Sequence, residues 1–332
     1  MDQGIPNGRR DRQKGRVGQI GEKGRGFCNG GTGKRRAPGG MMRFEYLEPE
    51  TIEEVLTILN RYQGKSKIIA GGTDLMLQMR NKAIKPEYVI DITRIPGLDY
   101  IELDDQRGLR IGALTTIRAL ETSVELQRKY RVISQAASQL GSVAIRNVAT
   151  VGGNLCNALP SAEMSQALVA LSAQVRIVGP GGQRTIPLEG FFTGVGKTLL
   201  QPNELLLEIL VPKSPPHTSG IYIKHSPRGP IDLAIVNVTV LMTMESDHQI
   251  CREAKIVLGA VSPTPLRARK AEEELEGKRV DGALIDRAAR VAADEAHPRH
   301  GSIRGSFEYK KEMIRVLTGR AIGELIGEVM GR

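Results

Sequence analysis

The sequence predicts an α+β protein built from consecutive parts. Over about 42–95, short apolar strands alternate with amphipathic helices, which is typical of a small α/β layer. Over about 96–213, two hairpin signatures enclose a helical stretch. Beyond residue 219 strands come first and helices follow, which predicts an antiparallel sheet with helices packed on it. We therefore predict a domain of two subdomains at 42–213 and an α+β domain at 219–330.

The first part has the order β-α-β-α-β. Thr51 followed by Glu54 is a capping box, in which side chains satisfy free amides at the start of a helix. Apolar residues then recur at helical spacing as far as Tyr62, and Gly64 ends the helix. The remaining elements are a strand at 68–70, a helix at about 75–81 and a strand at 88–92.

The other two parts are read from hairpins, breaks and helical periodicity. The second part contains hairpin strands at 101–103 and 109–111, a second hairpin at 175–178 and 184–187, helices near 117–126, 132–140 and 163–172, and a buried strand at 205–211. Residues 213–220 are predicted to be a linker. The third part contains strands at 221–224, 234–244 and 254–261, then helices near 265–275, 283–296 and 307–330.

The charge of the chain lies mostly in its first residues. The formal net charge is +10, but residues 1–40 hold ten Lys and Arg against three acidic residues. They also hold twelve of the 38 glycines and few apolar residues, so burial cannot offset the entropy of ordering them. We predict that 1–41 is a disordered tail or an extension that precedes a start at Met41 or Met42. An arm that binds nucleic acid or an acidic partner is the alternative.

Several classes of site are disfavoured by composition and spacing. Three dispersed cysteines and five histidines without ligand spacing predict no metal site and no disulfide framework. Cys156 is expected to be a small buried residue. No apolar run reaches the roughly 18 residues that span a bilayer, so we expect a soluble chain with no membrane span. The sequence lacks G-x-G-x-x-G and nucleophile motifs, and we predict no catalytic side chain.

Two double-glycine turns are the most informative local features. They are AGGTD at 70–74 and TVGGN at 150–154, and each is expected at the junction of a strand and a turn. Glycine permits positive φ and close approach of the backbone, so successive amides could form a nest for an anion such as a phosphate. Asp74 is also a candidate cap for the following helix. The alternative is that both pairs are simple turns.

Four motifs in a fixed order make a family resemblance specific. They are AGGTDL, RNVATVGGNLCNALPSAE, FFTGVGKTLLQPNELL and YIKHSPRGPIDLA. Together they closely resemble the FAD-binding medium subunit of molybdenum hydroxylases, which include the flavoproteins of carbon monoxide dehydrogenase and xanthine dehydrogenase. The resemblance runs from about Met42 to the C-terminal helices. It implies an FAD-binding domain of the vanillyl-alcohol oxidase type, with two subdomains at about 42–95 and 96–213, followed by a C-terminal α+β domain.

The resemblance also implies which residues contact FAD. One loop would hold the pyrophosphate, a second loop would complete the site, and two apolar and two charged side chains would lie near the flavin. The implied contacts are Ile68, Ile69, Ala70, Gly71, Gly72, Thr73, Asp74, Leu75, Leu140, Thr150, Val151, Gly152, Gly153, Asn154, Glu163, Leu206 and Lys224. Glu163 stands where the family usually has Asp, and Ala149 and Leu159 are further departures.

The function that the resemblance implies is electron transfer within a larger complex. A large molybdopterin subunit would oxidise the organic substrate, and a small subunit with [2Fe-2S] clusters would pass electrons to FAD on this chain. NAD, oxygen or a quinone would then accept them. We expect a dimer of heterotrimers in the cytoplasm, no nucleic-acid partner, and partner surfaces near Arg146 and Asn147. The alternatives are a stand-alone FAD-dependent reductase or oxidase of the same fold, and a scaffold subunit without cofactor.

The two charged residues have simpler alternatives. Glu163 could only cap the helix that it begins, and Lys224 could be a solvated charge at a strand end. If Lys224 does lie near the flavin, its charge would raise the reduction potential of FAD, and Lys224→Met would bind FAD with little loss.

Overall fold

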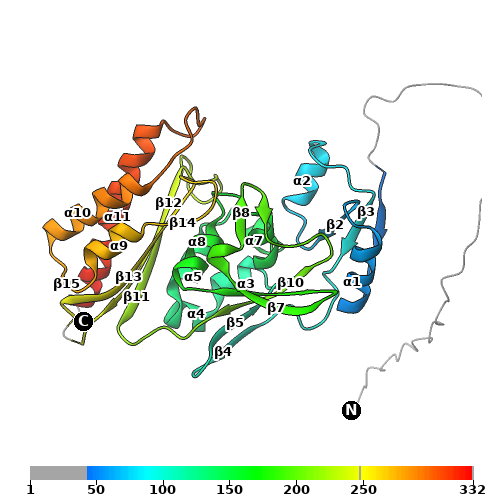
Figure 1. The fold of residues 1–332 in the computed structure, drawn as a ribbon, viewed down its shortest axis with the longest axis horizontal. Helices are drawn as coiled ribbons and strands as arrows, with labels where there is room; N and C mark the ends of the chain where they lie inside the picture. Colours follow the sequence, from blue (N-terminus) through cyan, green and yellow to red (C-terminus); the bar gives the residue numbers. More distant parts are fainter. Residues whose placement is uncertain (1–42, 247, 331–332) are drawn as a thin grey trace, which may run out of the picture. The chain divides into compact units, whose positions relative to one another are not determined.

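A computed structural model describes residues 43–246 and 248–330. The tail predicted over 1–41 lies outside the described residues. The first layer contains β1 (Glu45–Leu47), α1 (Ile52–Arg61), β2 (Ser66–Ile69), α2 (Leu75–Arg80) and β3 (Tyr88–Asp91), which confirms the predicted β-α-β-α-β order (Figure 1). Its strands form a parallel sheet in the order β1-β3-β2.

The start of α1 follows the predicted capping pattern with one difference. The Thr51 side chain accepts a hydrogen bond from the Glu54 amide at 3.2 Å. The Glu54 carboxylate accepts from the Glu50 amide at 2.8 Å, one residue before the expected position. Val55 and Leu59 on the inner face of α1 are buried in the core of this layer. Capping and burial together fix the helix beside its sheet.

A five-stranded antiparallel sheet forms the second layer. Its order is β4-β5-β10-β6-β7, with bounds β4 (Ile101–Asp104), β5 (Gly108–Gly112), β6 (Gln174–Gly179), β7 (Gly182–Pro187) and β10 (Leu205–Val211). Both predicted hairpins are present. A short 3-10 turn at Leu188–Gly190 precedes a small hairpin of β8 (Phe192–Gly194) and β9 (Lys197–Thr198).

Six helices connect the two hairpins of this sheet in the described chain. They are α3 (Ile117–Thr122), α4 (Val124–Lys129), α5 (Arg131–Ser138), α6 (Val143–Arg146), α7 (Val151–Asn157) and α8 (Glu163–Ala170). The single helix predicted at 117–126 is divided, because the Ser123 side chain caps a new helix by accepting from the Leu126 amide. All eight residues of α8 are buried, which places this helix inside the protein.

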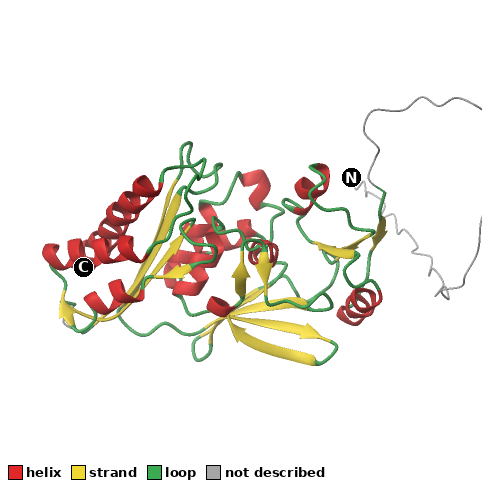
Figure 2. Ribbon diagram, turned by 45° about the horizontal axis from the view of Figure 1, so that its top comes forward, coloured by secondary structure: helices red, strands yellow, loops and turns green. Residues whose placement is uncertain are grey.

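The C-terminal part is an antiparallel sheet with helices, as predicted. The sheet contains β11 (Thr218–His225), β12 (Val236–Met244), β13 (Ile250–Gly259) and β14 (Leu266–Arg267), and β15 (Lys278–Arg279) pairs with β13. The helices α9 (Arg269–Leu275), α10 (Gly282–Glu295) and α11 (Phe307–Met330) pack on one face of it (Figure 2). The expected linker is shorter than predicted, because β11 already begins at Thr218.

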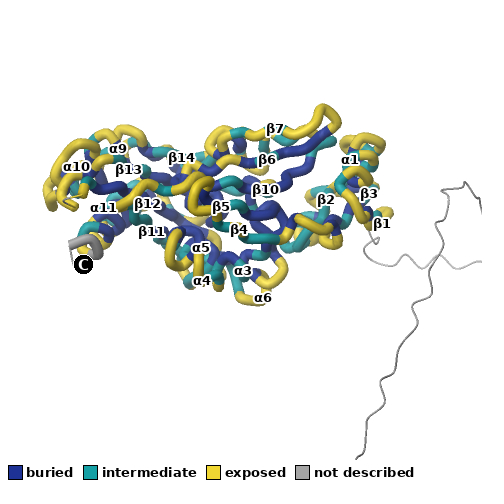
Figure 3. Tube along the Cα trace, turned by 90° about the horizontal axis from the view of Figure 1, so that it is seen from below, coloured by how far each residue is buried: buried dark blue, intermediate teal, exposed yellow. Residues whose placement is uncertain are grey.

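Both faces of the C-terminal sheet are covered. All nine residues of β12 are buried (Figure 3). Val236, Val238 and Val240 face the core that contains α9, α10 and α11. The alternate residue Leu241 belongs instead to the core that contains α5 and α8. This second contact joins the C-terminal sheet to the helices of the second layer, with β11 next to α5 and with β12 and β13 next to α8.

Candidate functional site

The first double-glycine turn follows β2 and touches the segment that precedes the second turn. A Cβ on Gly71 would lie 1.9 Å from the carbonyl oxygen of Val148, so only glycine allows this approach. Gly72 has a φ of +69°, in the left-handed region that favours glycine. The expected strand-to-turn junction is confirmed here, and each glycine has its own steric reason.

The backbone amides of this turn are available to a ligand. Among the described residues, none accepts a hydrogen bond from the amides of Gly71, Gly72, Thr73 or Asp74. Asp74 stands at the N-cap position of α2, but its side chain makes no capping hydrogen bond, so the predicted cap is wrong. Free consecutive amides next to a residue with positive φ form a concave group of donors that suits an anion.

The second double-glycine turn has a different structure from the predicted one. Residues 151–157 form α7, and a short helix rather than a strand precedes it. The Val151 amide donates to the Thr115 carbonyl at 3.0 Å and the Gly152 amide donates to the Ala113 carbonyl at 2.9 Å. Thr150 accepts from the Gly153 amide through its side chain at 3.1 Å. These amides are therefore occupied, and the nest predicted for this turn is wrong.

Gly152 of α7 serves packing, and one polar atom of this helix has no partner. A Cβ on Gly152 would lie 2.7 Å from the Ala113 carbonyl oxygen, so this glycine lets α7 approach the end of β5. Gly153 is exposed, and only the Thr150 hydroxyl would meet its Cβ. The side-chain oxygen of Asn154 is buried and has no hydrogen-bond partner. A ligand hydroxyl or amide could satisfy it.

The two turns are brought together with Glu163. Besides the contact of Gly71 with Val148, the Gln78 side chain of α2 donates to the side-chain oxygen of Asn157 in α7 at 3.1 Å. Burial raises the pKa of Asp74, whereas a hydrogen bond with Asn157 lowers it. Asp74 also lies near enough to Glu163 to raise the pKa of that carboxyl. Asn157 is not among the site residues predicted from the sequence, although it lies within the motif RNVATVGGNLCNALPSAE.

Glu163 of α8 and Lys224 of β11 form a buried ion pair. Their Nζ–Oε1 distance is 2.8 Å, and the side chains are 6% and 0% exposed for Glu163 and Lys224. Lys224 also donates to the carbonyls of Gln139 at 2.7 Å and Pro230 at 3.1 Å, so all three donors of its ammonium group are used. Lys224 is therefore not a solvated charge at a strand end, and Glu163 does more than begin α8.

The balance of forces at Glu163 favours a raised pKa. Burial is the largest cause and raises it, the charge and hydrogen bond of Lys224 lower it, and the Asp74 carboxylate raises it. Glu163 and Lys224 are thus a poorly solvated ion pair, and the charge of the half-buried Asp74 reaches Glu163. Such an arrangement is common where a ligand site is built from charged side chains.

The remaining predicted residues lie in or beside the main core. Leu140, just beyond α5, is 8% exposed, and Leu206 in β10 is 3% exposed.

Arg146 is buried and therefore cannot itself form a partner surface, whereas Asn147 is exposed. Cys156 is exposed, so the expectation that it is buried is wrong. α7 turns this side chain outward, while Leu155 beside it is buried.

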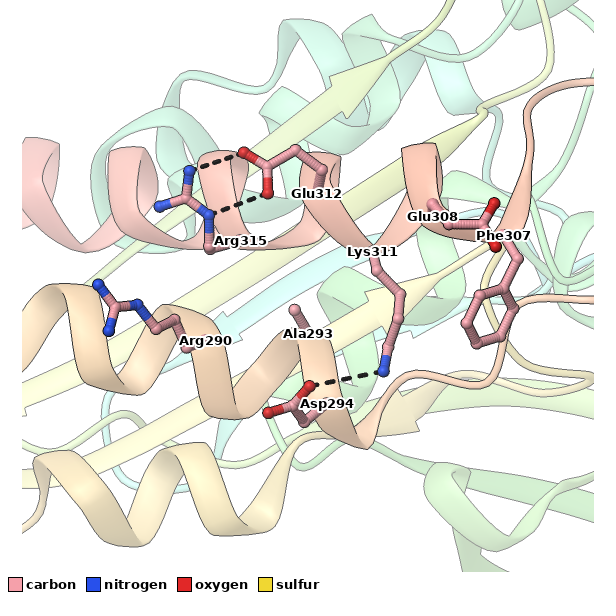
Figure 4. Close-up of a pocket in the computed structure, with 8 residues that line it drawn as sticks. All are labelled: Arg290, Ala293, Asp294, Phe307, Glu308, Lys311, Glu312 and Arg315. Carbon is pink, nitrogen blue, oxygen red and sulfur yellow. Dashed lines mark hydrogen bonds and ion pairs between the residues drawn. The ribbon is translucent and has the colours of Figure 1, made fainter.

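A groove between α10 and α11 is a separate feature. It has a volume of about 450 Å³ and is lined by Arg290, Ala293, Asp294, Phe307, Glu308, Lys311, Glu312 and Arg315 (Figure 4). Its charges pair with one another, Lys311 with Asp294 at 3.5 Å and Arg315 with Glu312 at 2.6 Å. None of the predicted site residues lines it. In the part of the chain that the structure describes, no group of His, Cys, Asp or Glu is arranged to hold a metal ion, and no helix could cross a membrane.

The cap of α7 gives a first testable prediction. Thr150→Ala removes the oxygen that accepts from the Gly153 amide, and we expect a loss of about 1 kcal/mol in the free energy of unfolding. Thr150→Ser keeps the oxygen and should restore most of it. Urea unfolding of the three proteins measures both changes. Equal stability of Thr150→Ala and the native chain would exclude the capping role.

Two families match the chain in consecutive segments. The family described as "FAD binding domain in molybdopterin dehydrogenase" matches residues 42–214, which is more than half of the chain. The family described as "CO dehydrogenase flavoprotein C-terminal domain" matches residues 221–325.

Characterised relatives cover almost the same length. The xanthine dehydrogenase FAD-binding subunit of Escherichia coli O157:H7 is 29% identical, over 86% of this chain and 97% of the relative. The carbon monoxide dehydrogenase medium chain of Hydrogenophaga pseudoflava is 31% identical, over 84% and 96%. The nicotinate dehydrogenase FAD-subunit of Eubacterium barkeri is 28% identical, over 88% and 99%. Three dehydrogenases with different substrates therefore contain a subunit of this kind.

Solved structures agree with the sequence relatives. A chain of carbon monoxide dehydrogenase from Hydrogenophaga pseudoflava superposes with a TM-score of 0.81 at 32% identity, covering 85% of this chain and 96% of that chain. A chain of quinoline 2-oxidoreductase from Pseudomonas putida 86 gives a TM-score of 0.80 at 26% identity, covering 86% and 98%. The predicted fold class is thereby confirmed. The chain belongs to the FAD-binding subunits of molybdenum hydroxylase-type dehydrogenases, and it is the flavoprotein subunit of an oxidoreductase with FAD as its cofactor.

Proposed function

We propose that this chain relays electrons within a molybdenum hydroxylase complex and does not itself contact the organic substrate. FAD, when bound, supplies the electron transfer, between [2Fe-2S] clusters of a small subunit and an external acceptor such as NAD, oxygen or a quinone. A large molybdopterin subunit would oxidise the substrate. One observation supports the proposal most directly. In a chain of this family, the first glycine turn packs against the segment that leads into the second, and the buried Glu163–Lys224 pair belongs to the same region.

The two turns would have different roles in holding FAD. The free amides of residues 71–74 fit the negatively charged pyrophosphate, since they point at no acceptor in the described protein. The buried, unpaired oxygen of Asn154 fits a donor on the cofactor. We propose that the contacts are Ile68, Ile69, Ala70, Gly71, Gly72, Thr73, Asp74, Leu75, Leu140, Thr150, Val151, Gly152, Gly153, Asn154, Glu163, Leu206 and Lys224.

Lys224 would act differently from the isolated cation that the sequence suggested. Its ammonium group is neutralised by Glu163 and holds two backbone carbonyls. That Lys224→Met binds FAD with little loss stays a prediction, but the substitution would also break a buried ion pair. Lys224 would instead fix the start of α8 and the loop around Pro230 against the end of α5.

The organisation of the chain and of its complex is part of the proposal. Residues 42–213, with subdomains at about 42–95 and 96–213, would bind the cofactor, and 219–330 would form the C-terminal domain. The complex would be a dimer of heterotrimers in the cytoplasm. The relatives include medium chains and a named subunit of a dehydrogenase complex, which supports a role among several subunits.

The test compares the chain alone with the assembled complex. The purified chain should show flavin absorbance and be reduced by dithionite, but should not oxidise organic substrates by itself. Addition of the small and large subunits should allow the substrate to bleach the flavin. Turnover of a substrate by the chain alone would favour the stand-alone enzyme, and a chain that takes up no FAD would favour the scaffold subunit.

A further inference from the structure

We propose that Arg146 is a positioning residue of the FAD site, which acts through the turn at the end of α5. This inference rests on the proposed FAD contacts. The Arg146 side chain is 8% exposed, although arginine is mostly found at protein surfaces. It is anchored by Glu121 of α3, with Nε–Oε2 and Nη2–Oε1 distances of 2.7 and 3.2 Å. The paired bonds fix the plane of the guanidinium group.

The same guanidinium group also donates hydrogen bonds to the backbone of the turn that follows α5. Nη1 of Arg146 donates to the carbonyls of Leu140 at 3.1 Å and Gly141 at 2.8 Å. Gly141 has a φ of +53° and lies three residues after Ser138, the last residue of α5. Both carbonyls follow the end of α5, and a charged guanidinium group forms stronger hydrogen bonds with them than a neutral donor would.

A second buried cation holds this turn from the C-terminal domain. Lys224 donates to the Gln139 carbonyl at 2.7 Å. Residues 139–141 are thus held by Arg146 on one side and by Lys224 on the other. Lys224 also binds Glu163, so the turn is tied to the start of α8 as well.

The turn is connected to both glycine segments. Arg146 ends α6, and Val148, two residues later, supplies the carbonyl against which Gly71 packs. Thr150 then caps α7. A shift of the 139–141 turn would therefore move Leu140 directly. Through Arg146 it would also move Val148, against which Gly71 packs, and Thr150, which caps α7. This is the physical basis for expecting an effect of Arg146 on FAD.

Arg118, the second arginine bound to Glu121, provides a matched control. The Glu121 carboxylate binds Arg118 at 2.9 Å, but the Arg118 side chain is 42% exposed. Although burial acts to raise it, the hydrogen bonds from Arg118 and Arg146 hold the pKa of Glu121 below its ordinary value. Arg118→Gln therefore removes an ion pair with the same carboxylate and leaves the carbonyls of residues 140 and 141 held.

The experiment titrates FAD into the flavin-free full-length chain and follows flavin fluorescence. Arg146→Gln should raise the Kd for FAD about tenfold, which corresponds to about 1.4 kcal/mol. It should also change the visible circular dichroism of the bound flavin at saturation. Arg118→Gln should stay within about twofold of the native Kd, as expected for an exposed ion pair. Arg146→Lys keeps the positive charge but lacks the planar array of donors of the guanidinium group, so it should recover part of the affinity for FAD.

The outcomes separate this inference from the proposed function. A native chain that binds no FAD would remove the proposed function on which the inference depends. A native Kd and dichroism for Arg146→Gln, even with a lower Tm, would show that Arg146 only stabilises the fold. If Arg146→Gln does not fold, Arg146→Lys carries the test, because native FAD affinity and dichroism in that variant would overturn the positioning role.

Discussion

Replacing Gly71 with alanine is expected to abolish FAD retention and to lower the Tm. The new Cβ would lie 1.9 Å from the Val148 carbonyl oxygen and 2.9 Å from the Cα of Ala149, and both are backbone atoms. The two segments must therefore separate, because no side-chain rotation relieves the contact. Overpacking of this kind costs about 1–3 kcal/mol. The separation would also displace the free amides of residues 71–74 from the second turn.

Other glycines supply a graded comparison for this result. Gly72→Ala meets only flexible side chains but adopts a φ of +69°, so we expect a smaller loss of FAD. Gly190→Ala meets nothing within 4 Å and serves as the neutral control. FAD content from absorbance and the Tm of the flavin-free protein are measured for each. Full flavin content in Gly71→Ala would contradict the assignment of this turn to the cofactor.

Lys224→Met is expected to destabilise the folded chain strongly. The substitution leaves the Glu163 carboxyl buried without its cation and leaves the Gln139 and Pro230 carbonyls without a donor. Breaking a buried pair by removing one partner costs about 3–5 kcal/mol. Lys310→Met is a suitable control, because Lys310 is also a buried lysine that donates to a carbonyl, that of Ala260, but the ion-pair partner of Glu163 is Lys224.

The pH dependence of this variant identifies the cause. Burial raises the pKa of Glu163, so the folded chain holds this proton more readily than the unfolded chain. The contribution of Glu163 to stability is complete below the ordinary glutamate pKa and is lost as the pH rises through the raised value. Lys224 lowers the pKa of Glu163, so this pKa rises further in Lys224→Met. The loss of stability then continues to a higher pH in the variant than in the native chain. The Tm deficit of Lys224→Met should therefore be larger near about pH 8 than near about pH 5.

A double variant serves as the control for this pH effect. Glu163→Gln combined with Lys224→Met removes the titrating group, and its Tm deficit should change little between the two pH values. Melting curves of the native chain and both variants measure these differences. A deficit of Lys224→Met that does not depend on pH would show that Glu163 is not the group left without a partner.

Local sequence patterns predicted the elements of the fold well. The capping residue Thr51 and the helical spacing after it placed α1, and the alternation of strands and helices placed the first layer. These features arise from sterics and hydrogen bonds between residues a few positions apart. Ser123 divided a predicted helix because its side chain competes for backbone amides, which the apolar periodicity does not reveal.

The candidate site could be predicted only in part. The two glycine pairs and the motif order indicated an FAD-binding subunit of the molybdenum hydroxylase family, and the sequence relatives confirmed that family. The pairs also suggested the same anion nest at both turns. The structure distinguishes them, because the carbonyls of Ala113 and Thr115 occupy the amides of Gly152 and Val151. Nothing near residues 150–154 in the sequence shows that these acceptors arrive there.

The sequence by itself determined the order of most elements and the family of the chain. Only the tertiary structure decided which charges are buried and what they hold. Lys224 meets Glu163 across 61 residues and Gln139 across 85, and Arg146 meets Glu121 across 25. Such pairs form where β11 packs on α5, where β12 and β13 pack on α8, and where α6 approaches α3. Their partners depend on how distant elements pack, and short-range patterns contain no information about that packing.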